Sequence, residues 1–321
     1  MEEKQEVLIS IKNLNKEFKG GGRTVHAVNN VSLDIYKGET LGLVGESGCG
    51  KSTLGNMLLH LHTPTSGDVY FEGQEISRLR NREVKKLYRR LQIIFQDPYS
   101  SLDPKKKIGW LIEEPLKIHG IGNSKSERDV IVADMLEVVG LDSSYLDKYP
   151  NELSGGQRQR VAIAIALVLS PEFVVCDEAV SALDVSVQAQ VLNLLKNLQE
   201  KFSLTYLFIS HNLNVVSYMS DRVGIMYLGE IVELGDVEEI SDKPLHPYGR
   251  ALFSASLGVQ KSSEERIILK GDLPSPANPP AGCPFHTRCY MAQEICKSQK
   301  PELKDMGKGH FCACHRAEEN K

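Results

Sequence analysis

The stretch TLGLVGESGCGKST, residues 40–53, decides the fold class of this chain. Its first part is a continuous apolar run that ends in glycine, which is typical of a strand buried on both faces of a parallel or mixed sheet. Its second part, residues 45–52, matches the pattern G-x-x-x-x-G-K-[ST], and the helical segment LGNMLLHLH follows. A strand, a glycine-rich loop and a helix in this order predict a loop whose backbone N–H groups cradle phosphate oxygens.

The residue types in this loop have separate roles in binding a nucleotide with Mg²⁺. Glycines let the backbone approach the phosphates, Lys51 can reach the β- and γ-phosphates, and the Ser52 hydroxyl can ligate Mg²⁺. Kinases, GTPases, helicases and transporters all use such a loop, so other residues must distinguish among them. The predicted nucleotide-binding residues here are Gly45, Glu46, Ser47, Gly48, Cys49, Gly50, Lys51, Ser52 and Thr53.

Further strands and helices alternate along the chain. The runs FVVC (residues 173–176) and TYLFIS (residues 205–210) resemble the buried strand before the loop, and apolar residues recur at helical spacing over residues 187–202. Residues 223–235 read as a hairpin that turns near Gly229. This alternation predicts an α/β fold with a mixed sheet and with its sites at the carboxyl ends of the strands.

Polar residues stand where these strands end. Asp177 is placed to hold the Mg²⁺ shell, and Glu178 to orient or deprotonate an attacking water. His211 could meet the γ-phosphate, and Gln96, which ends the run LQIIFQ, could join the metal–water network. Each signal alone is weak, because many strands end in acids and a lone histidine is usually structural.

The motif LSGGQ, residues 153–157, selects among these classes of nucleotide-binding protein. A serine and two glycines precede the helical run QRQRVAIAIALVL, so the chain carries a second anion-binding helix start. One γ-phosphate does not need two such cradles from one subunit. A head-to-tail dimer, in which each LSGGQ closes over the glycine-rich loop of the partner, explains why one chain carries two such phosphate-binding segments.

In these motifs and their order the chain resembles the ATP-binding cassette (ABC) family, over about residues 7–250. The resemblance implies a phosphate-loop NTPase (RecA-like) core with an inserted helical subdomain. It implies that Phe18 stacks on adenine, that Ser52 and Gln96 serve Mg²⁺, and that Glu178, His211 and Gln96 are catalytic. It also implies that ATP is bound in trans by Ser154, Gly155, Gly156 and Gln157.

Three further segments resemble the ATP-binding subunits of oligopeptide and dipeptide importers, and the sequences of residues 45–53 (GESGCGKST) and 177–190 (DEAVSALDVSVQAQ) resemble those of the F-type subunit. The three segments are residues 96–104 (QDPYSSLDP), 244–255 (PLHPYGRALFSA) and 274–289 (PSPANPPAGCPFHTRC). The implied partners are a second, D-type ATP-binding subunit, two integral membrane permeases and, through them, an extracellular peptide-binding protein. The cargo rests on the resemblance alone, and a nickel chelate or another solute stays open.

Composition bounds the remaining possibilities. The chain has 321 residues with 41% hydrophobic residues and a net charge of -4, which favours an ordinary globular protein and argues against nucleic acid as a partner. The start MEEKQEV lacks a secretory signal, and the apolar run of residues 161–169 is too short to cross a bilayer. We expect a peripheral protein on the cytoplasmic side of the plasma (inner) membrane.

We expect two parts along the chain. Residues 1–255 form the ATPase domain, with the helical subdomain at about 97–165, and residues 256–321 form a small cysteine-rich C-terminal extension. A soluble ABC ATPase for DNA repair or translation would usually carry a coiled-coil insertion or a second cassette, and neither is present. A regulatory or assembly protein that uses ATP without transport is the other alternative.

Five of the seven cysteines lie in the last 39 residues. Relatives with this tail bind a four-iron four-sulfur cluster, and the resemblance assigns its ligands to Cys283, Cys289, Cys296 and Cys314, the last chosen over Cys312 because a Cys-His ending aligns with the family tail. Zinc, free thiols or a disulfide stay open, although structural zinc sites favour closer cysteine pairs. The histidines at 286, 310 and 315 are read as surface residues.

Overall fold

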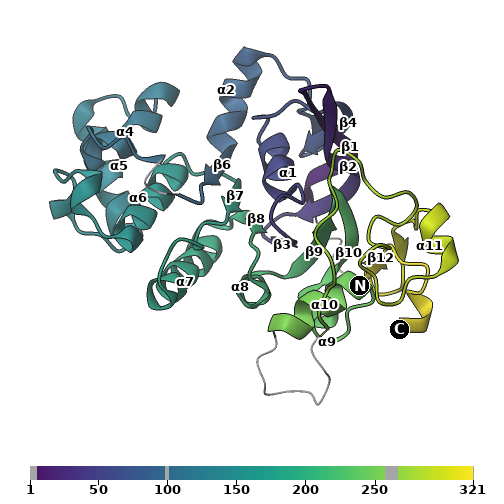
Figure 1. The fold of residues 1–321 in the computed structure, drawn as a ribbon. Coiled ribbons are helices and arrows are strands. Elements are labelled where there is room, and N and C mark those ends of the chain that lie inside the picture. The colour runs from purple at the N-terminus through teal and green to yellow at the C-terminus, as the bar shows by residue number, and fades with distance from the viewer. Residues whose placement is uncertain (1–5, 98–100, 257–266, 321) are drawn as a thin grey trace. The chain divides into compact units, whose positions relative to one another are not determined.

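The computed structural model describes residues 6–97, 101–256 and 267–320, which divide into two compact units (Figure 1). The first unit combines Met1–Arg78 with Phe208–Lys321, and the second is Leu79–Leu207. Part of the predicted 96–104 motif and the beginning of the predicted extension, residues 257–266, lie outside the described residues.

An antiparallel sheet in the first unit begins with a long hairpin. Strand β1 (Val7–Gly20) pairs with β2 (Arg23–Tyr36), and Gly20 lies opposite Arg23 at the turn. Near the start of β1 both faces of the strand are covered, because the consecutive residues Leu8 and Ile9 are almost fully buried, as is Ile11. The strand order is β2-β1-β4-β5, with β4 at Ser66–Phe71 and β5 at Gln74–Glu75.

The second sheet of this unit carries the glycine-rich loop. Strand β3 (Thr40–Val44) is buried along its whole length and runs parallel to β9 (Arg222–Tyr227). The predicted hairpin is confirmed, because β9 turns back into the antiparallel strand β10 (Glu230–Asp236). The C-terminal tail extends the sheet beyond β10 with β12 (Phe311–Cys312) and β11 (Lys304–Asp305).

Short helices complete the first unit, and the tail contributes only a few residues of regular structure between residues 267 and 320. The helices are α1 (Lys51–Leu58), α8 (Leu213–Met219), α9 (Val237–Asp242), α10 (Pro247–Ser256), α11 (Glu294–Ser298) and the 3₁₀ turn η3 (Glu318–Asn320).

The second unit is mostly helical around a parallel strand pair. Strand β6 (Leu91–Ile94) pairs with β7 (Phe173–Asp177), whose first four residues are fully buried. Figure 1 shows α4, α5 and α6 gathered together in this unit. The helices are α2 (Asn81–Arg90), α4 (Ile108–His119), α5 (Lys125–Val138), α6 (Gly155–Leu167) and α7 (Val185–Phe202), with 3₁₀ turns η1 (Ser143–Tyr145) and η2 (Pro150–Glu152).

The chain passes between the units within strand β8 (Thr205–Ile209), which is buried throughout. The predicted α/β fold with a mixed sheet is therefore confirmed. In the described part of the chain, none of the helices is both long enough and apolar enough to span a bilayer.

Candidate functional site

The glycine-rich loop connects β3 to α1 in the first unit. Strand β3 ends at Val44, and α1 begins at Lys51 with Gly50 as its N-cap in the left-handed region, at φ 109°. A Cβ atom at Gly50 would lie 2.1 Å from the carbonyl oxygen of Ala27. Only glycine fits there, because both the φ angle and the neighbouring backbone exclude a side chain.

Lys51, at the carboxyl end of the loop, bonds back to the residues at the start of the loop. Its Nζ donates hydrogen bonds to the carbonyl oxygens of Gly45, at 2.8 Å, and of Glu46, at 3.0 Å. The Lys51 side chain is buried, whereas Ser52 is exposed in the first turn of α1. The helix start therefore presents backbone N–H groups, a hydroxyl and an ammonium group around one short loop, which suits a polyphosphate with its metal ion.

Two other predicted residues belong to the same unit. Phe18 lies on β1 with 40% of its surface exposed, and its ring meets the edge of His62 at 5.6 Å between centroids. His211 directly follows Ser210, whose N–H donates to the carbonyl oxygen of Leu43 on β3 at 3.2 Å. His211 therefore leaves the sheet at the end of β3 from which the glycine-rich loop also starts.

The second unit brings together Gln96 and Glu178. The parallel strands β6 and β7 pair Ile94 with Cys176, so the residues that follow these two strands emerge at the same edge. The Gln96 Nε2 donates to the Glu178 Oε2 at 2.9 Å. This contact places an amide beside a carboxylate, as a water-positioning pair requires.

Glu178 also has an unusual backbone. Its φ angle is 49°, in the left-handed region that costs energy for a residue with a side chain. The N–H and the hydroxyl of Ser181 both donate to the Glu178 carbonyl oxygen, each at 3.0 Å. The turn that follows β7 therefore holds the strained residue, with Asp177 just before it at the strand end.

The LSGGQ motif forms the start of α6. The helix begins two residues earlier than the sequence indicated, because Gly155 and Gly156 are already helical and Ser154 is the N-cap. The Ser154 hydroxyl accepts from the Gln157 N–H, and the Gln157 Oε1 accepts from the Ser154 N–H, which is a capping box. The Gln157 Nε2 donates to the Tyr145 hydroxyl at 2.7 Å. The helix start is therefore held by side-chain hydrogen bonds, with Ser154 exposed and Gly155, Gly156 and Gln157 half-buried.

Sequence reasoning missed two residues that contact the glycine-rich loop. The Glu46 N–H donates to the Tyr248 hydroxyl at 3.0 Å, and the Arg288 Nη1 donates to the Glu46 Oε2 at 2.9 Å. Both lie in segments singled out in the sequence, namely residues 244–255 and 274–289. Neither segment carries a local signal of this contact, since the partners are separated by 202 and 242 residues.

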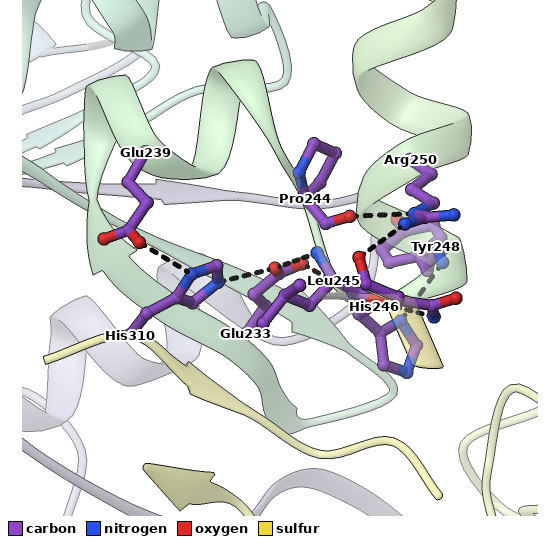
Figure 2. Close-up of polar contacts among 9 residues, drawn as sticks. Glu233, Glu239, Pro244, Leu245, His246, Tyr248, Arg250 and His310 are labelled. Atoms are coloured by element: carbon purple, nitrogen blue, oxygen red, sulfur yellow. Dashed lines mark hydrogen bonds and ion pairs between the residues drawn. The ribbon is translucent and has the colours of Figure 1, made fainter. Parts of the chain in front are cut away.

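A buried carboxylate fastens the segment that carries Tyr248 (Figure 2). Glu233 accepts from the N–H groups of Leu245, at 2.6 Å, and His246, at 3.1 Å, and from the His310 Nε2 at 2.8 Å. The Tyr248 N–H donates to the His246 Nδ1 at 3.1 Å. Burial lowers the pKa of His246 to about 3, so its ring is neutral and can accept this hydrogen bond.

The four predicted cluster cysteines line one small pocket. Cys283, Cys289, Cys296 and Cys314 all face it, together with apolar atoms of Phe285 and Met291. Burial, opposed by a backbone hydrogen bond from Phe285 and reinforced by the other three cysteines, raises the pKa of the Cys283 thiol to about 12. Cys312 is not among the residues that line this pocket, and it packs in an apolar cluster with Leu245 and Ala317, against which Cys314 also packs.

The histidines of the tail have other partners. The reading of His310 as a surface residue is wrong, because it is 3% exposed and bonded to Glu233. His286 and His315 lie beside the carbonyl oxygens of Cys283 and Gln299, at 2.9 and 3.0 Å. Within the described ranges, no group of three or more His, Cys, Asp or Glu side chains has the arrangement of a formed metal site.

Two family models match the chain. The model described as "ABC transporter" matches residues 28–181, which include the glycine-rich loop and the strand that ends at Asp177. The model described as "Oligopeptide/dipeptide transporter, C-terminal region" matches residues 232–296, which include Glu233, Tyr248 and Arg288.

Curated relatives are similar along nearly the whole chain. The oligopeptide transport ATP-binding protein AppF of Bacillus subtilis (strain 168) is 51% identical over 97% of this chain and 98% of its own length. The dipeptide transport ATP-binding protein DppF of Haemophilus influenzae is 49% identical over 90% of this chain and 89% of its own length.

Solved ATP-binding cassettes share the fold. The dimeric post-hydrolysis structure of the cassette MJ0796 bound to ADP and Pi is 32% identical, with a TM-score of 0.66 over 72% of this chain and 99% of that one. The cassette cbiO1 from Clostridium perfringens is 26% identical, with a TM-score of 0.67 over 74% of this chain and 92% of that one. The expected phosphate-loop NTPase fold is thereby confirmed.

Proposed function

This chain belongs to the ABC transporter family of ATPases, and on that premise we propose that it energises the import of oligopeptides or dipeptides. The observation that carries the proposal is the joint presence of the two family regions on one chain. The peptide-transporter region is built into the nucleotide-binding unit, because Tyr248 and Arg288 both bond to Glu46. The cargo class follows from relatives named as oligopeptide and dipeptide transport proteins.

The residues of the first unit would bind the nucleotide. The N–H groups of residues 47–52 would hold the ATP phosphates, Lys51 would exchange its two loop carbonyls for phosphate oxygens, and Ser52 would ligate Mg²⁺. Phe18 would stack on the adenine, which its 40% exposure permits. His211 would contact the γ-phosphate.

The residues of the second unit would carry hydrolysis. Asp177 would hold the Mg²⁺ shell, and Glu178 would orient and deprotonate the attacking water. Gln96 would keep the Glu178 carboxylate in place and reach the metal ion, and their 2.9 Å contact supports this role. The strained backbone of Glu178 is further support, because such strain gathers at functional positions.

Closure with a second ATP-binding subunit would complete each site. Ser154, Gly155, Gly156 and Gln157 would bind the γ-phosphate held by the partner subunit, and the N-terminus of α6 suits that task. The dimeric structure of the similar cassette MJ0796 supports this arrangement. We propose a heterodimer with a D-type subunit, bound to two permeases at the cytoplasmic face of the membrane and served by an extracellular peptide-binding protein.

The cysteine pocket would hold a four-iron four-sulfur cluster. Cys283, Cys289, Cys296 and Cys314 provide the four thiolates that such clusters take, and their shared pocket is largely apolar. The cluster would supply a cross-link that fixes a tail too small to form its own core. Iron and acid-labile sulfide assays on protein prepared without oxygen test this, and zinc at one ion per chain would contradict it.

Co-purification tests the transport function. We expect the tagged protein, extracted from membranes with detergent, to carry two integral membrane proteins, and peptide to stimulate its ATPase activity only with a peptide-binding protein present. Stimulation by a nickel chelate and not by peptide would replace the proposed cargo. Active ATPase that brings no membrane protein with it would refute the transport function while leaving ATP hydrolysis intact.

A further inference from the structure

The cysteine-rich tail reaches the glycine-rich loop through one buried arginine. Arg288 lies between Cys283 and Cys289, and its side chain is 8% exposed. Its Nη1 donates to the Glu46 Oε2 at 2.9 Å, and the Glu46 carboxylate is itself only 29% exposed. A charge-assisted hydrogen bond between side chains with such low solvent exposure is stronger than an ion pair on the surface.

An aromatic cluster holds the same part of the tail against the loop. The Phe285 ring meets the edge of Tyr227 at 5.2 Å and lies 5.4 Å from Tyr248, and the two tyrosine rings are 4.8 Å apart. The Tyr248 hydroxyl in turn accepts from the Glu46 N–H. Glu46 therefore makes two hydrogen bonds outside the loop, one from its carboxylate to Arg288 and one from its backbone N–H to Tyr248.

The third polar group of Glu46 belongs to the nucleotide site. Its carbonyl oxygen accepts from the Lys51 Nζ at 3.0 Å and from the Cys49 N–H at 3.2 Å. Glu46 therefore contributes both to the shape of the loop and to the position of the Lys51 side chain. The tail contacts this same residue through Arg288. Any shift of the Glu46 backbone moves the lysine that binds phosphate.

A second contact between tail and body lies further along the first unit. The His26 N–H on β2 donates to the Pro276 carbonyl oxygen at 3.1 Å. The segment before the cysteines is therefore bonded to the body, and further along the tail the Ala313 N–H donates to the Val232 carbonyl oxygen on β10 at 2.8 Å, so the chain is fixed on both sides of Arg288. This restricts the positions open to the arginine.

We propose that Arg288 is a positioning residue for ATP binding, through which the cysteine-rich tail holds the phosphate-binding loop in its binding shape. Arg288 touches Glu46 and acts through it on Lys51. Because coupling between two sites is reciprocal, bound ATP stabilises the docked tail by the same factor by which the docked tail tightens ATP binding. The proposal rests on the proposed function only in requiring that the loop binds ATP.

Equilibrium binding of a fluorescent ATP analogue to the full-length protein tests this. Arg288→Gln should weaken binding by about fivefold or more, the lower range of coupling between sites, while kcat at saturating ATP changes less than KM. Arg288→Lys keeps the charge and should recover part of the affinity. Arg316→Gln is the matched control, because that tail arginine donates to the exposed Glu319 carboxylate at 2.6 Å, and the variant should bind ATP as the wild type does.

A double-mutant cycle separates coupling from general damage. Glu46→Gln should weaken binding about as much as Arg288→Gln, and the double variant should be no weaker than either, since both remove one interaction. The thermal midpoint without nucleotide shows whether Arg288→Gln folds. If it does not fold, the ATP affinity of Glu46→Gln, compared with that of the Arg316→Gln control, tests the proposal. Unchanged affinity in the folded variants, additive losses, or an equal loss in Arg316→Gln overturns the proposal. A wild-type protein that binds no ATP analogue would instead refute the proposed function.

Discussion

The buried histidine of the segment at residues 244–255 gives the most quantitative prediction. His246 is 1% exposed, and burial lowers its pKa from the usual 6.5 to about 3. Below pH 6.5 the unfolded chain therefore takes up a proton at this residue that the folded chain does not bind. The free energy of unfolding must fall as the pH decreases from 6.5 toward 3, and this contribution is fully present above pH 6.5.

The size of the effect follows from the two pKa values. Between pH 7 and pH 5 the unfolded state gains about 2 kcal/mol from protonating this one imidazole, at about 1.4 kcal/mol per pH unit once the pH is well below 6.5. The His246→Asn variant keeps an acceptor for the Tyr248 N–H and removes the titration. Every other acid-sensitive group is shared with the wild type, so the difference between the two proteins isolates His246.

Urea unfolding at half-unit pH steps, followed by far-UV circular dichroism, measures this difference. We expect the wild type to lose about 2 kcal/mol more than His246→Asn between pH 7 and pH 5, and the two curves to run parallel above pH 7. His246→Phe should show the same loss of pH dependence at a different absolute stability. Parallel curves over the whole range would refute the assignment of a neutral, buried imidazole.

Three further perturbations test the nucleotide site and the second unit. Gly50→Ala should weaken ATP binding at least about tenfold in an equilibrium binding assay, because the added Cβ would lie 2.1 Å from the Ala27 carbonyl oxygen. Gly20→Ala is the control and should bind ATP normally, because its Cβ would have no neighbouring atom within 4 Å. Glu178→Gln should bind ATP but release phosphate about 100-fold more slowly and accumulate as an ATP-bound dimer on gel filtration, and wild-type turnover would disprove its role. Glu113→Gln should lower the free energy of unfolding by about 2 kcal/mol in urea, since Glu113 is buried and accepts from Arg128 at 3.0 Å, and an unchanged midpoint would contradict this.

Local signals in the sequence predicted the elements that build the site. The run of residues 40–44 is a strand because five successive apolar or small residues suit burial on both faces, and the glycines after it permit the tight loop. The capping-box pattern S-x-x-Q fixes the start of α6, although sequence periodicity placed that helix later because Gly155 and Gly156 read as loop residues. Neighbouring parallel strands also brought Gln96 to Glu178, as the strand-end argument requires.

The tail was harder to interpret from sequence. His310 reads as a surface residue because a single histidine near a chain end has no pattern, yet it is buried and hydrogen-bonded to the buried Glu233. The choice between Cys312 and Cys314 rested on resemblance, and the structure distinguishes them. Cys314 lines the cysteine pocket and also packs against the apolar cluster that contains Cys312, whereas Cys312 ends strand β12 and is not among the residues that line the pocket.

Local patterns in the sequence were enough to predict a phosphate-binding loop after a buried strand, a second anion-binding helix start, and acids at the strand end that suit an ATPase. These features follow from side-chain periodicity and backbone preference within a few residues. The hydrogen bonds of Tyr248 and Arg288 to Glu46, across 202 and 242 residues, could be found only in the folded chain. Such contacts depend on how packed elements meet, and a hydrogen bond between distant side chains leaves no periodic trace in the sequence.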